Sequence, residues 1–239
     1  MTRRQPRLCI ALDGSDRRWI LDTARALAGT AGWLKVGLEA FVAHGPRLVG
    51  EVAELGPPVF LDLKLHDIPA TVRRAAANAA ACGARMLTVH SSGGRDMMEA
   101  AVEGAGQGGG AAAPLVVAVT LLTSLDEATL EQLSLPGPPE ATVLRWAELA
   151  RESGVAGVVA SAREAAAVRA RCGRELLIVT PGVRPAGDRQ DDQRRTATPA
   201  EAVRAGADIL VVGRPITGAA SPLDAARRII EEMAGAASE

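Results

Sequence analysis

The chain has 239 residues, a length that suits one sizeable hydrophobic core and lies close to the usual size of an eight-stranded α/β barrel. Hydrophobic residues make up 48% of the chain and charged residues 23%, which is typical of a globular protein. The formal net charge of −1 excludes the basic field that nucleic-acid or membrane-surface binding would need. We therefore expect no nucleic-acid partner, and a local cluster of cations has to hold any anionic ligand.

The cysteines and the start of the chain indicate where the protein works. Cys9, Cys82 and Cys172 are odd in number and far apart, without metal-ligand spacing or a disulfide framework. Residues 1–7 are basic but have no long apolar stretch behind them, so no signal peptide is expected. No segment approaches the roughly 18 consecutive apolar residues of a membrane span. The sequence therefore predicts a cytoplasmic protein without a membrane partner.

Short apolar runs, each bounded by Gly, Pro or polar residues, alternate with longer helical patterns along the whole chain. Such runs are typical of buried parallel strands. The eight predicted strands are Leu8–Leu12, Leu34–Gly37, Val59–Leu63, Met86–Val89, Leu115–Val119, Gly157–Ala160, Leu176–Val179 and Ile209–Val212. Strands that alternate with helices predict a parallel sheet with right-handed crossovers. Eight such units favour an α/β fold of the (β/α)8 TIM-barrel type, in one domain over residues 1–239, rather than an open doubly wound sheet.

The segments between the strands are predicted to be helices or loops. Helical patterns cover Thr71–Cys82, Ala162–Arg171, Pro199–Ala205 and Asp224–Met233, and a glycine follows each of the first three. Two stretches have the composition of surface loops: Gly104–Pro114, rich in Gly and Ala, and Pro136–Glu140, rich in Pro. The polar stretch Pro181–Thr198 follows the seventh strand. We expect it to be a binding loop or lid on the face where barrels carry their active sites.

Charged residues occupy predicted interior positions of the first three strands. Asp62 and Lys64 alternate with leucines, so the leucines should face the helices and the two charged side chains the barrel interior. Lys35 lies in a similar position on the second strand, and Asp13 ends the first. Burying charge is costly, which favours a functional site, although a buried ion-pair network that sets strand register remains the alternative. A carboxylate between lysines should stay ionised, and the lysines should stay protonated.

The segment Asp62–Thr71 resembles the Asp-x-Lys-x-x-Asp signature of orotidine 5′-phosphate decarboxylases, in the bacterial form that continues with Ile-Pro. The resemblance covers nearly the whole chain and also includes Ala11–Asp13, Lys35–Gly37, Val89–Gly94, Val119–Ser124, Thr180–Arg184, Asp192–Arg195 and Val211–Thr217. The Asp-Lys-Asp signature alone is shared with relatives of different activity, whereas all of these segments in this order are highly specific. Ala70 and the pair Ser91–Ser92 depart from common family residues without removing a charged group.

The resemblance implies a cofactor-free carboxy-lyase that converts orotidine 5′-phosphate to uridine 5′-phosphate and carbon dioxide in de novo pyrimidine biosynthesis. Lys64 would then protonate C6 of the pyrimidine, and Asp62 would sit beside the departing carboxylate. Lys35 and Asp67 would complete an alternating array of charges. In the family, the residue that matches Asp67 reaches into the neighbouring subunit's site, so a homodimer is implied.

The resemblance also implies a substrate-binding set. Asp13 and Lys35 match ribose-hydroxyl contacts, Thr123 matches a substrate contact after the fifth strand, and Asp62 and Thr71 belong to the signature segment. The phosphate site matches Arg184, Gln193, Gly213 and Arg214. Physical chemistry supports this last assignment, because barrels commonly bind phosphate with the loops after strands seven and eight. A glycine there allows close backbone approach, and an arginine offers a planar fork of donors.

Three other functions stay open. One is a metal-dependent sugar-phosphate decarboxylase or aldolase on a related barrel, against which the Thr123–Ser124 segment and the Gln193 loop speak. Another is an aldolase that forms a Schiff base through Lys64. The third is a nucleotide-phosphate-binding barrel that has lost catalysis, which the intact Lys and Asp set argues against. No two histidines have metal-ligand spacing, so no metal is expected, and His66 is predicted to pack or hydrogen-bond.

Overall fold

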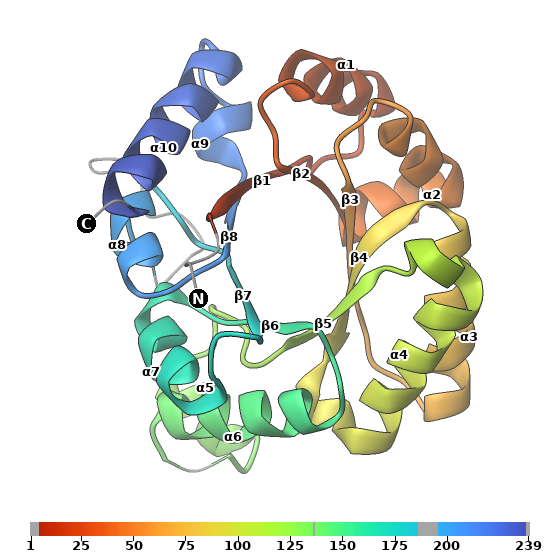
Figure 1. Ribbon diagram of the computed structural model, residues 1–239, viewed down its shortest axis with the longest axis vertical. Coiled ribbons are helices and arrows are strands. Elements are labelled where there is room, and N and C mark those ends of the chain that lie inside the picture. The colour runs from red at the N-terminus through yellow and green to blue at the C-terminus, as the bar shows by residue number, and fades with distance from the viewer. Residues whose placement is uncertain (1–4, 136, 186–195, 238–239) are drawn as a thin grey trace.

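The computed structural model of the protein describes residues 5–135, 137–185 and 196–237. In these ranges eight parallel strands follow one another around a closed barrel, and β8 pairs with β1 (Figure 1). The strands are β1 (Arg7–Ala11), β2 (Trp33–Gly37), β3 (Val59–Leu65), β4 (Ala84–His90), β5 (Leu115–Val119), β6 (Gly157–Val159), β7 (Leu177–Thr180) and β8 (Ile209–Val212). The predicted (β/α)8 barrel is confirmed, and the strand ends agree with the predicted ends to within two residues.

Helices form a ring outside the barrel (Figure 1). They are α1 (Arg17–Leu27), α2 (Leu38–Ala53), α3 (Pro69–Ala81), α4 (Gly94–Gly109), α5 (Glu127–Gln132), α6 (Pro139–Glu152), α7 (Ala162–Cys172), α8 (Pro199–Arg204), α9 (Arg214–Thr217) and α10 (Pro222–Ala237). The four predicted helices are confirmed as α3, α7, α8 and α10, with small differences at their ends. The predicted loop Pro136–Glu140 is wrong at its end, because Pro139 starts α6 at the position where proline's missing N–H costs nothing.

The second predicted loop, Gly104–Pro114, is wrong over most of its length, because its first half is the end of α4. A Cβ atom at Gly104 would lie 2.0 Å from the carbonyl oxygen of Arg73, and one at Gly108 would lie 2.2 Å from that of Ala77. Both carbonyls belong to α3. These glycines therefore let two helix backbones approach closely, and the composition that is typical of a loop serves helix packing instead.

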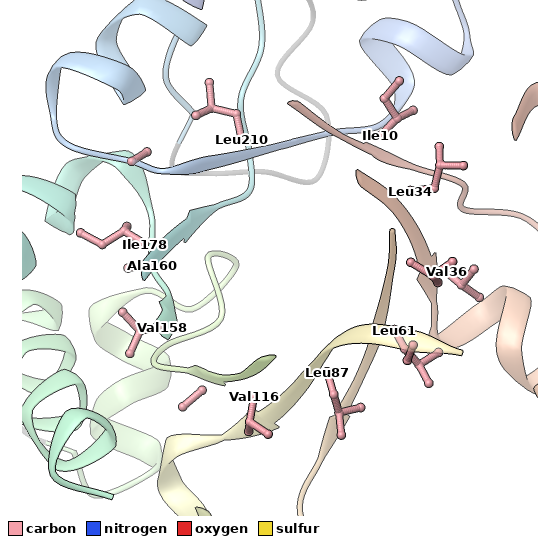
Figure 2. Packing of buried hydrophobic residues seen from close by; sticks show 14 of the residues in the cluster. Ile10, Leu34, Val36, Leu61, Leu87, Val116, Val158, Ala160, Ile178 and Leu210 are labelled. Carbon is pink, nitrogen blue, oxygen red and sulfur yellow. The ribbon is translucent and has the colours of Figure 1, made fainter. Parts of the chain in front are cut away.

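Alternation along the strands separates two apolar layers. Outward-facing side chains such as Ile10, Leu61 and Leu87 fill the space between the strands and the helices (Figure 2). A second cluster of inward-facing side chains fills the barrel towards the amino ends of the strands: Cys9, Trp33, Phe60, Met86, Val117, Val179 and Ile209. This inner cluster leaves the interior positions near the carboxyl ends of the strands free for polar groups.

Two further observations concern the helices and the cysteines. In the described ranges, no helix combines the length and apolar character that crossing a bilayer would require. The three cysteines are free thiols, of which Cys9 and Cys172 are buried.

Candidate active site

A cavity of about 680 Å³ opens at the carboxyl ends of the strands, which is the face where barrel enzymes carry their active sites. Phe60 and Val179, from the inner apolar cluster, contribute to its lining. The cavity brings together eight of the residues predicted from the sequence: Asp13, Lys35, Asp62, Lys64, Thr123, Arg184, Gly213 and Arg214. Residues that lie up to 201 positions apart in the chain therefore line one site.

Four of these residues form a row of alternating charges from β1 to β3. The Lys35 ammonium lies 2.8 Å from Asp13 Oδ1 and 3.5 Å from Asp62 Oδ2. Asp62 Oδ1 in turn lies 2.8 Å from Lys64 Nζ. The side chains of Lys35 and Asp62 are 9% and 13% exposed, whereas that of Lys64 is 35% exposed. Lys64 is therefore the more accessible of the two ammonium groups.

Electrostatics keeps the inner members of this row charged. Burial alone would raise the pKa of Asp62, but the positive charges of Lys35 and Lys64, with hydrogen bonds, outweigh it and hold that pKa below its ordinary value. Burial likewise opposes the charge of Lys35, but the carboxylates of Asp62 and Asp13 raise its pKa above the ordinary value. At neutral pH the carboxylate stays ionised and the Lys35 ammonium stays protonated, as the sequence predicts.

Lys64 lies in an irregular part of β3. Between the pairs that Leu61 and Leu65 form with β4, three residues of β3 face the single residue Thr88. Lys64 has a φ of 53°, a left-handed conformation that non-glycine residues rarely adopt. Its backbone N–H donates a hydrogen bond of 2.8 Å to Thr88 Oγ1. Rare backbone conformations of this kind gather at functional sites, where the surroundings hold them in place.

Thr88 and Gly37 belong to the site although the charge pattern does not single them out. Thr88 is fully buried and donates to Asp62 Oδ1 at 2.9 Å. A Cβ atom at Gly37 would lie 2.6 Å from Asp13 Oδ1 and 2.9 Å from Lys35 Nζ. The signal for Thr88 is a polar residue between two apolar neighbours on a buried strand, and Gly37 is recognisable only from the neighbouring side chains.

Lysine usage is a further signal in the sequence. The chain carries two lysines, Lys35 and Lys64, while its other 25 basic residues are arginines. Both lysines line the cavity. Arginine stays protonated in proteins, whereas lysine has a compact ammonium that can give up a proton. Lysine therefore occurs where proton transfer is possible, and arginine provides the remaining positive charge.

Arginines and a glycine line the side of the cavity formed by β7 and β8. Arg184 Nε is buried and has no hydrogen-bond partner among the described residues. The Arg184 backbone N–H donates to Ala197 O at 2.9 Å, which joins the two described ends of the Pro181–Thr198 stretch. A Cβ atom at Gly213 would point towards Ala11 and Asp13, at 3.5 and 4.0 Å, and would reduce the free space. This side can accept an anion.

Two of the predicted site residues are not among those that line the cavity, and a third lies outside the described residues. Asp67 is exposed, and its Oδ1 accepts the backbone N–H of Ile68 at 2.7 Å. Thr71 lies in the first turn of α3, where its N–H donates to the carbonyl of Ile68. Gln193 lies outside the described residues. The part of the chain that the structure describes therefore does not place Asp67 or Thr71 in this cavity.

Two histidines contact each other close to the lysine end of the charged row. The rings of His66 and His90 have centroids 5.5 Å apart and planes inclined by 44°. Burial, with the nearby His66 and Lys64, lowers the pKa of His90, so its imidazole is neutral at neutral pH. In the described ranges, His, Cys, Asp and Glu side chains form no group of three that could hold a metal ion.

The fold and the cavity define a (β/α)8-barrel protein with an enzyme-like site, in which a row of ammonium and carboxylate groups shares one cavity with arginines. The sequence model of the Orotidine 5′-phosphate decarboxylase / HUMPS family matches residues 6–229. The chain belongs to this family, which confirms the resemblance that its motifs indicate.

Individual relatives agree over nearly the full length. The orotidine 5′-phosphate decarboxylase of Anaeromyxobacter sp. (strain K) is 57% identical over 93% of this chain and 96% of that protein. The enzyme of the same name from Nitratidesulfovibrio vulgaris is 51% identical over 96% of this chain and 99% of that protein. The crystal structure of orotidine 5′-phosphate decarboxylase from Lactobacillus acidophilus has a TM-score of 0.84 and 34% identity, with coverage of 96% and 99%.

Proposed function

We propose that this protein is an orotidine 5′-phosphate decarboxylase, a carboxy-lyase that forms uridine 5′-phosphate and carbon dioxide in de novo pyrimidine biosynthesis. The observation that carries the proposal is the Lys64 ammonium, 2.8 Å from the Asp62 carboxylate in a cavity that also contains arginines. Family membership supports the same reaction. The proposal treats residues 1–239 as one catalytic domain, requires no cofactor and includes the cytoplasmic location expected from the sequence.

The chemistry needs a cation where negative charge develops. When the bond between C6 and the carboxylate breaks, carbon dioxide leaves and the electron pair remains on C6. Lys64 provides a fixed positive charge for that pair and then transfers a proton from Nζ to C6. Asp62 holds the ammonium in place, and Lys35 keeps Asp62 ionised. The charges are ordered before the reaction begins, so little reorganisation is needed during it.

The remaining cavity residues bind the parts of the substrate that do not react. Arg184 and Arg214, with the backbone at Gly213 and the side chain of Gln193, take the phosphate, and the buried Nε of Arg184, which has no partner among the described residues, can donate to it. Contacts that are remote from C6 can stabilise the transition state through binding energy. The ribose hydroxyls lie at Asp13 and Lys35, and the hydroxyl of Thr123 contacts the substrate near β5. These roles follow the family resemblance, and all of these residues except Gln193, which lies outside the described ranges, line the cavity.

We infer that the protein works as a homodimer that shares Asp67 across its interface. Asp67 is exposed, and so are its neighbour Ile68 after β3 and two apolar side chains in the first half of α2, which follows β2: Ile68 is 67%, Leu38 57% and Val42 76% exposed. Exposed apolar surface of this kind is typical of subunit contacts. In a dimer that covers this surface, Asp67 of one subunit would lie at the rim of the other subunit's cavity, with Thr71 behind it.

The test is a spectrophotometric assay with orotidine 5′-phosphate after metal chelation, applied to the wild-type protein and Lys64→Ala. We expect turnover by the wild-type protein without added metal. Lys64→Ala should abolish turnover because it removes the proposed proton donor, while calorimetry should still detect uridine 5′-phosphate binding. Near-normal turnover by Lys64→Ala would remove the proton-donor role.

The other candidate functions predict different results, which companion experiments can detect. Magnesium-dependent turnover of a sugar phosphate would identify a different reaction on this barrel. A Lys64–substrate adduct trapped by borohydride would indicate a Schiff base. Tight uridine 5′-phosphate binding by a wild-type protein that does not decarboxylate would indicate a binding protein. Each of these results would contradict the proposed function.

A further inference from the structure

Thr88 occupies the position on β4 that faces the irregular part of β3. Its neighbours Leu87 and Val89 point outward into the layer beneath the helices, so the Thr88 side chain points inward. The residue is completely buried. Because β3 has extra residues here, the Lys64 N–H hydrogen-bonds to the Thr88 hydroxyl oxygen at 2.8 Å rather than to a β4 carbonyl. A hydrogen bond to a side chain therefore takes the place of a backbone hydrogen bond of the sheet.

Chemistry fixes the direction of each hydrogen bond around this hydroxyl. A backbone N–H only donates, so Thr88 Oγ1 accepts from Lys64. An ionised carboxylate only accepts, so the one hydroxyl proton of Thr88 goes to Asp62 Oδ1, at 2.9 Å. Asp62 Oδ1 also accepts from Lys64 Nζ, at 2.8 Å. The three residues form a closed ring in which the backbone and the ammonium of Lys64 are connected through Thr88 and Asp62.

We propose that Thr88 is a positioning residue for decarboxylation, which holds Lys64 at its backbone directly and at its ammonium through Asp62. The inference rests on the proposed function and extends it to a residue outside the charged row. Thr88 is not among the residues that line the cavity in the described part of the chain, so it acts through its two neighbours. Its hydroxyl accepts from the part-buried N–H of Lys64, a residue in a rare backbone conformation, and limits the positions of the proton donor.

The consequence concerns the chemical step more than substrate binding. Proton transfer to one carbon requires the ammonium to lie within a narrow range of positions, whereas binding draws on contacts throughout the cavity. Without the hydroxyl, the Lys64 N–H loses its partner in a buried site, and Asp62 loses one of the hydrogen bonds that orient it. Both changes widen the range of positions open to the Lys64 side chain.

Kinetics of matched variants test this role. Thr88→Val removes the hydroxyl but keeps the shape, and Thr88→Ser keeps the hydroxyl. Thr180→Val is the control, because Thr180 is equally buried and its Oγ1 has no hydrogen-bond partner among the described residues. We expect kcat of Thr88→Val to fall about ten- to a hundredfold, the loss of a hydrogen bond to a charged group, with KM changed by less than about threefold. Thr88→Ser and Thr180→Val should stay within about threefold of the wild-type kcat.

A pH titration gives a readout that a merely structural role would not change. Removing a hydrogen bond to an ionised carboxylate raises its pKa, so the acidic limb of kcat should move to higher pH in Thr88→Val and not in Thr180→Val. Carbon-13 NMR of the Asp62 carboxyl, assigned with Asp62→Asn, should show the same shift. The other charged or titratable groups that act on this carboxylate or lie near it are the same in the wild-type protein and in Thr88→Val, so they do not cause the shift: Lys35, Lys64, Cys9, Asp13 and His90.

The NMR measurement does not depend on turnover, which separates this inference from the proposed function. An inactive wild-type protein would overturn the function, while the Asp62 titration would still test Thr88. Wild-type kcat in folded Thr88→Val, or an Asp62 titration unchanged from wild type, would overturn the role of Thr88. If Thr88→Val does not fold, Thr88→Cys takes its place, because a thiol is a weaker donor and acceptor. An intermediate kcat is then expected, and wild-type kcat with a wild-type acidic limb would contradict the inference.

Discussion

Gly37 shows how the absence of a side chain can shape a charged site. It ends β2 with an extended backbone, and an added Cβ atom would come within 3 Å of both members of the Asp13–Lys35 pair. Gly37→Ala should therefore push these two groups apart and reduce kcat/KM for orotidine 5′-phosphate about tenfold, with KM rising more than kcat falls. KM should change more than kcat because Asp13 and Lys35 are both proposed to contact the ribose.

Gly50 provides the control for this substitution. It lies in α2, and its nearest neighbour, Cys82 O, would be 4.0 Å from an added Cβ atom. Gly50→Ala should leave the kinetic constants at wild-type values. Equal kinetics in Gly37→Ala and Gly50→Ala would show that the Asp13–Lys35 pair does not depend on the space at Gly37.

The residues of the site differ in how far the sequence reveals them. Asp62 and Lys64 are predictable because a two-residue period places them on the inner face of β3, where charge is costly. Thr88 is harder to predict, because its role depends on the irregular pairing of β3, which the regular period does not indicate. Asp67 lies beyond the end of β3, where periodicity no longer applies, and its role rests on family resemblance.

Among the elements, α4 shows that composition and packing can point in opposite directions. Its second half contains the run of small residues that predicts a loop, yet α3 and α4 lie against each other in the outer ring (Figure 1). Glycine lowers helix propensity, but at Gly104 and Gly108 it allows two backbones to meet. Local propensity therefore fails here because a tertiary contact outweighs it. The strands are predicted better, since each carries its own burial pattern.

The glycines of α4 should differ in their effect on stability. Gly104→Ala places a methyl group 2.0 Å from the α3 backbone, so the helices must separate, at a cost of about 1–3 kcal/mol in the free energy of unfolding. Gly106→Ala meets nothing within 4 Å and should stabilise the protein by about 0.5–1 kcal/mol, because alanine favours the helix. Urea denaturation at one fixed protein concentration measures both. Equal stabilities for the two variants would contradict the close contact.

On the scale of the whole molecule, one part of the barrel interior stabilises the fold and another part carries the charged site. Apolar side chains fill the part near the amino ends of the strands, and the charged row occupies the carboxyl ends. The alternation of strands and helices makes this architecture predictable from the sequence. Assembly is not predictable in the same way, because exposed residues such as Ile68 and Asp67 leave no periodic pattern. A second copy of the chain would give these residues a role.

Hybrid dimers can show whether the site is shared between subunits. Lys64→Ala damages the site of its own chain, whereas Asp67→Ala is expected to damage the partner's site. Each homodimer should then be nearly inactive. In a hybrid of the two variants, the chain with Asp67→Ala keeps its Lys64 and receives Asp67 from the other chain. One of the two sites is therefore intact, and the hybrid should show about half of the wild-type activity per dimer.

The experiment uses co-expression with two affinity tags, so that only hybrids are purified and assayed. The control is a hybrid of Lys64→Ala with Lys35→Ala, since both lysines line the cavity of their own chain and each substitution damages that chain's site. This control should stay nearly inactive. If the Lys64→Ala and Asp67→Ala hybrid is also inactive, Asp67 acts within its own chain. An active Asp67→Ala homodimer would show that Asp67 has no role in the site. Sedimentation of the wild-type protein as a monomer would contradict the shared site directly, because a cavity completed by its neighbour requires the neighbour to be bound.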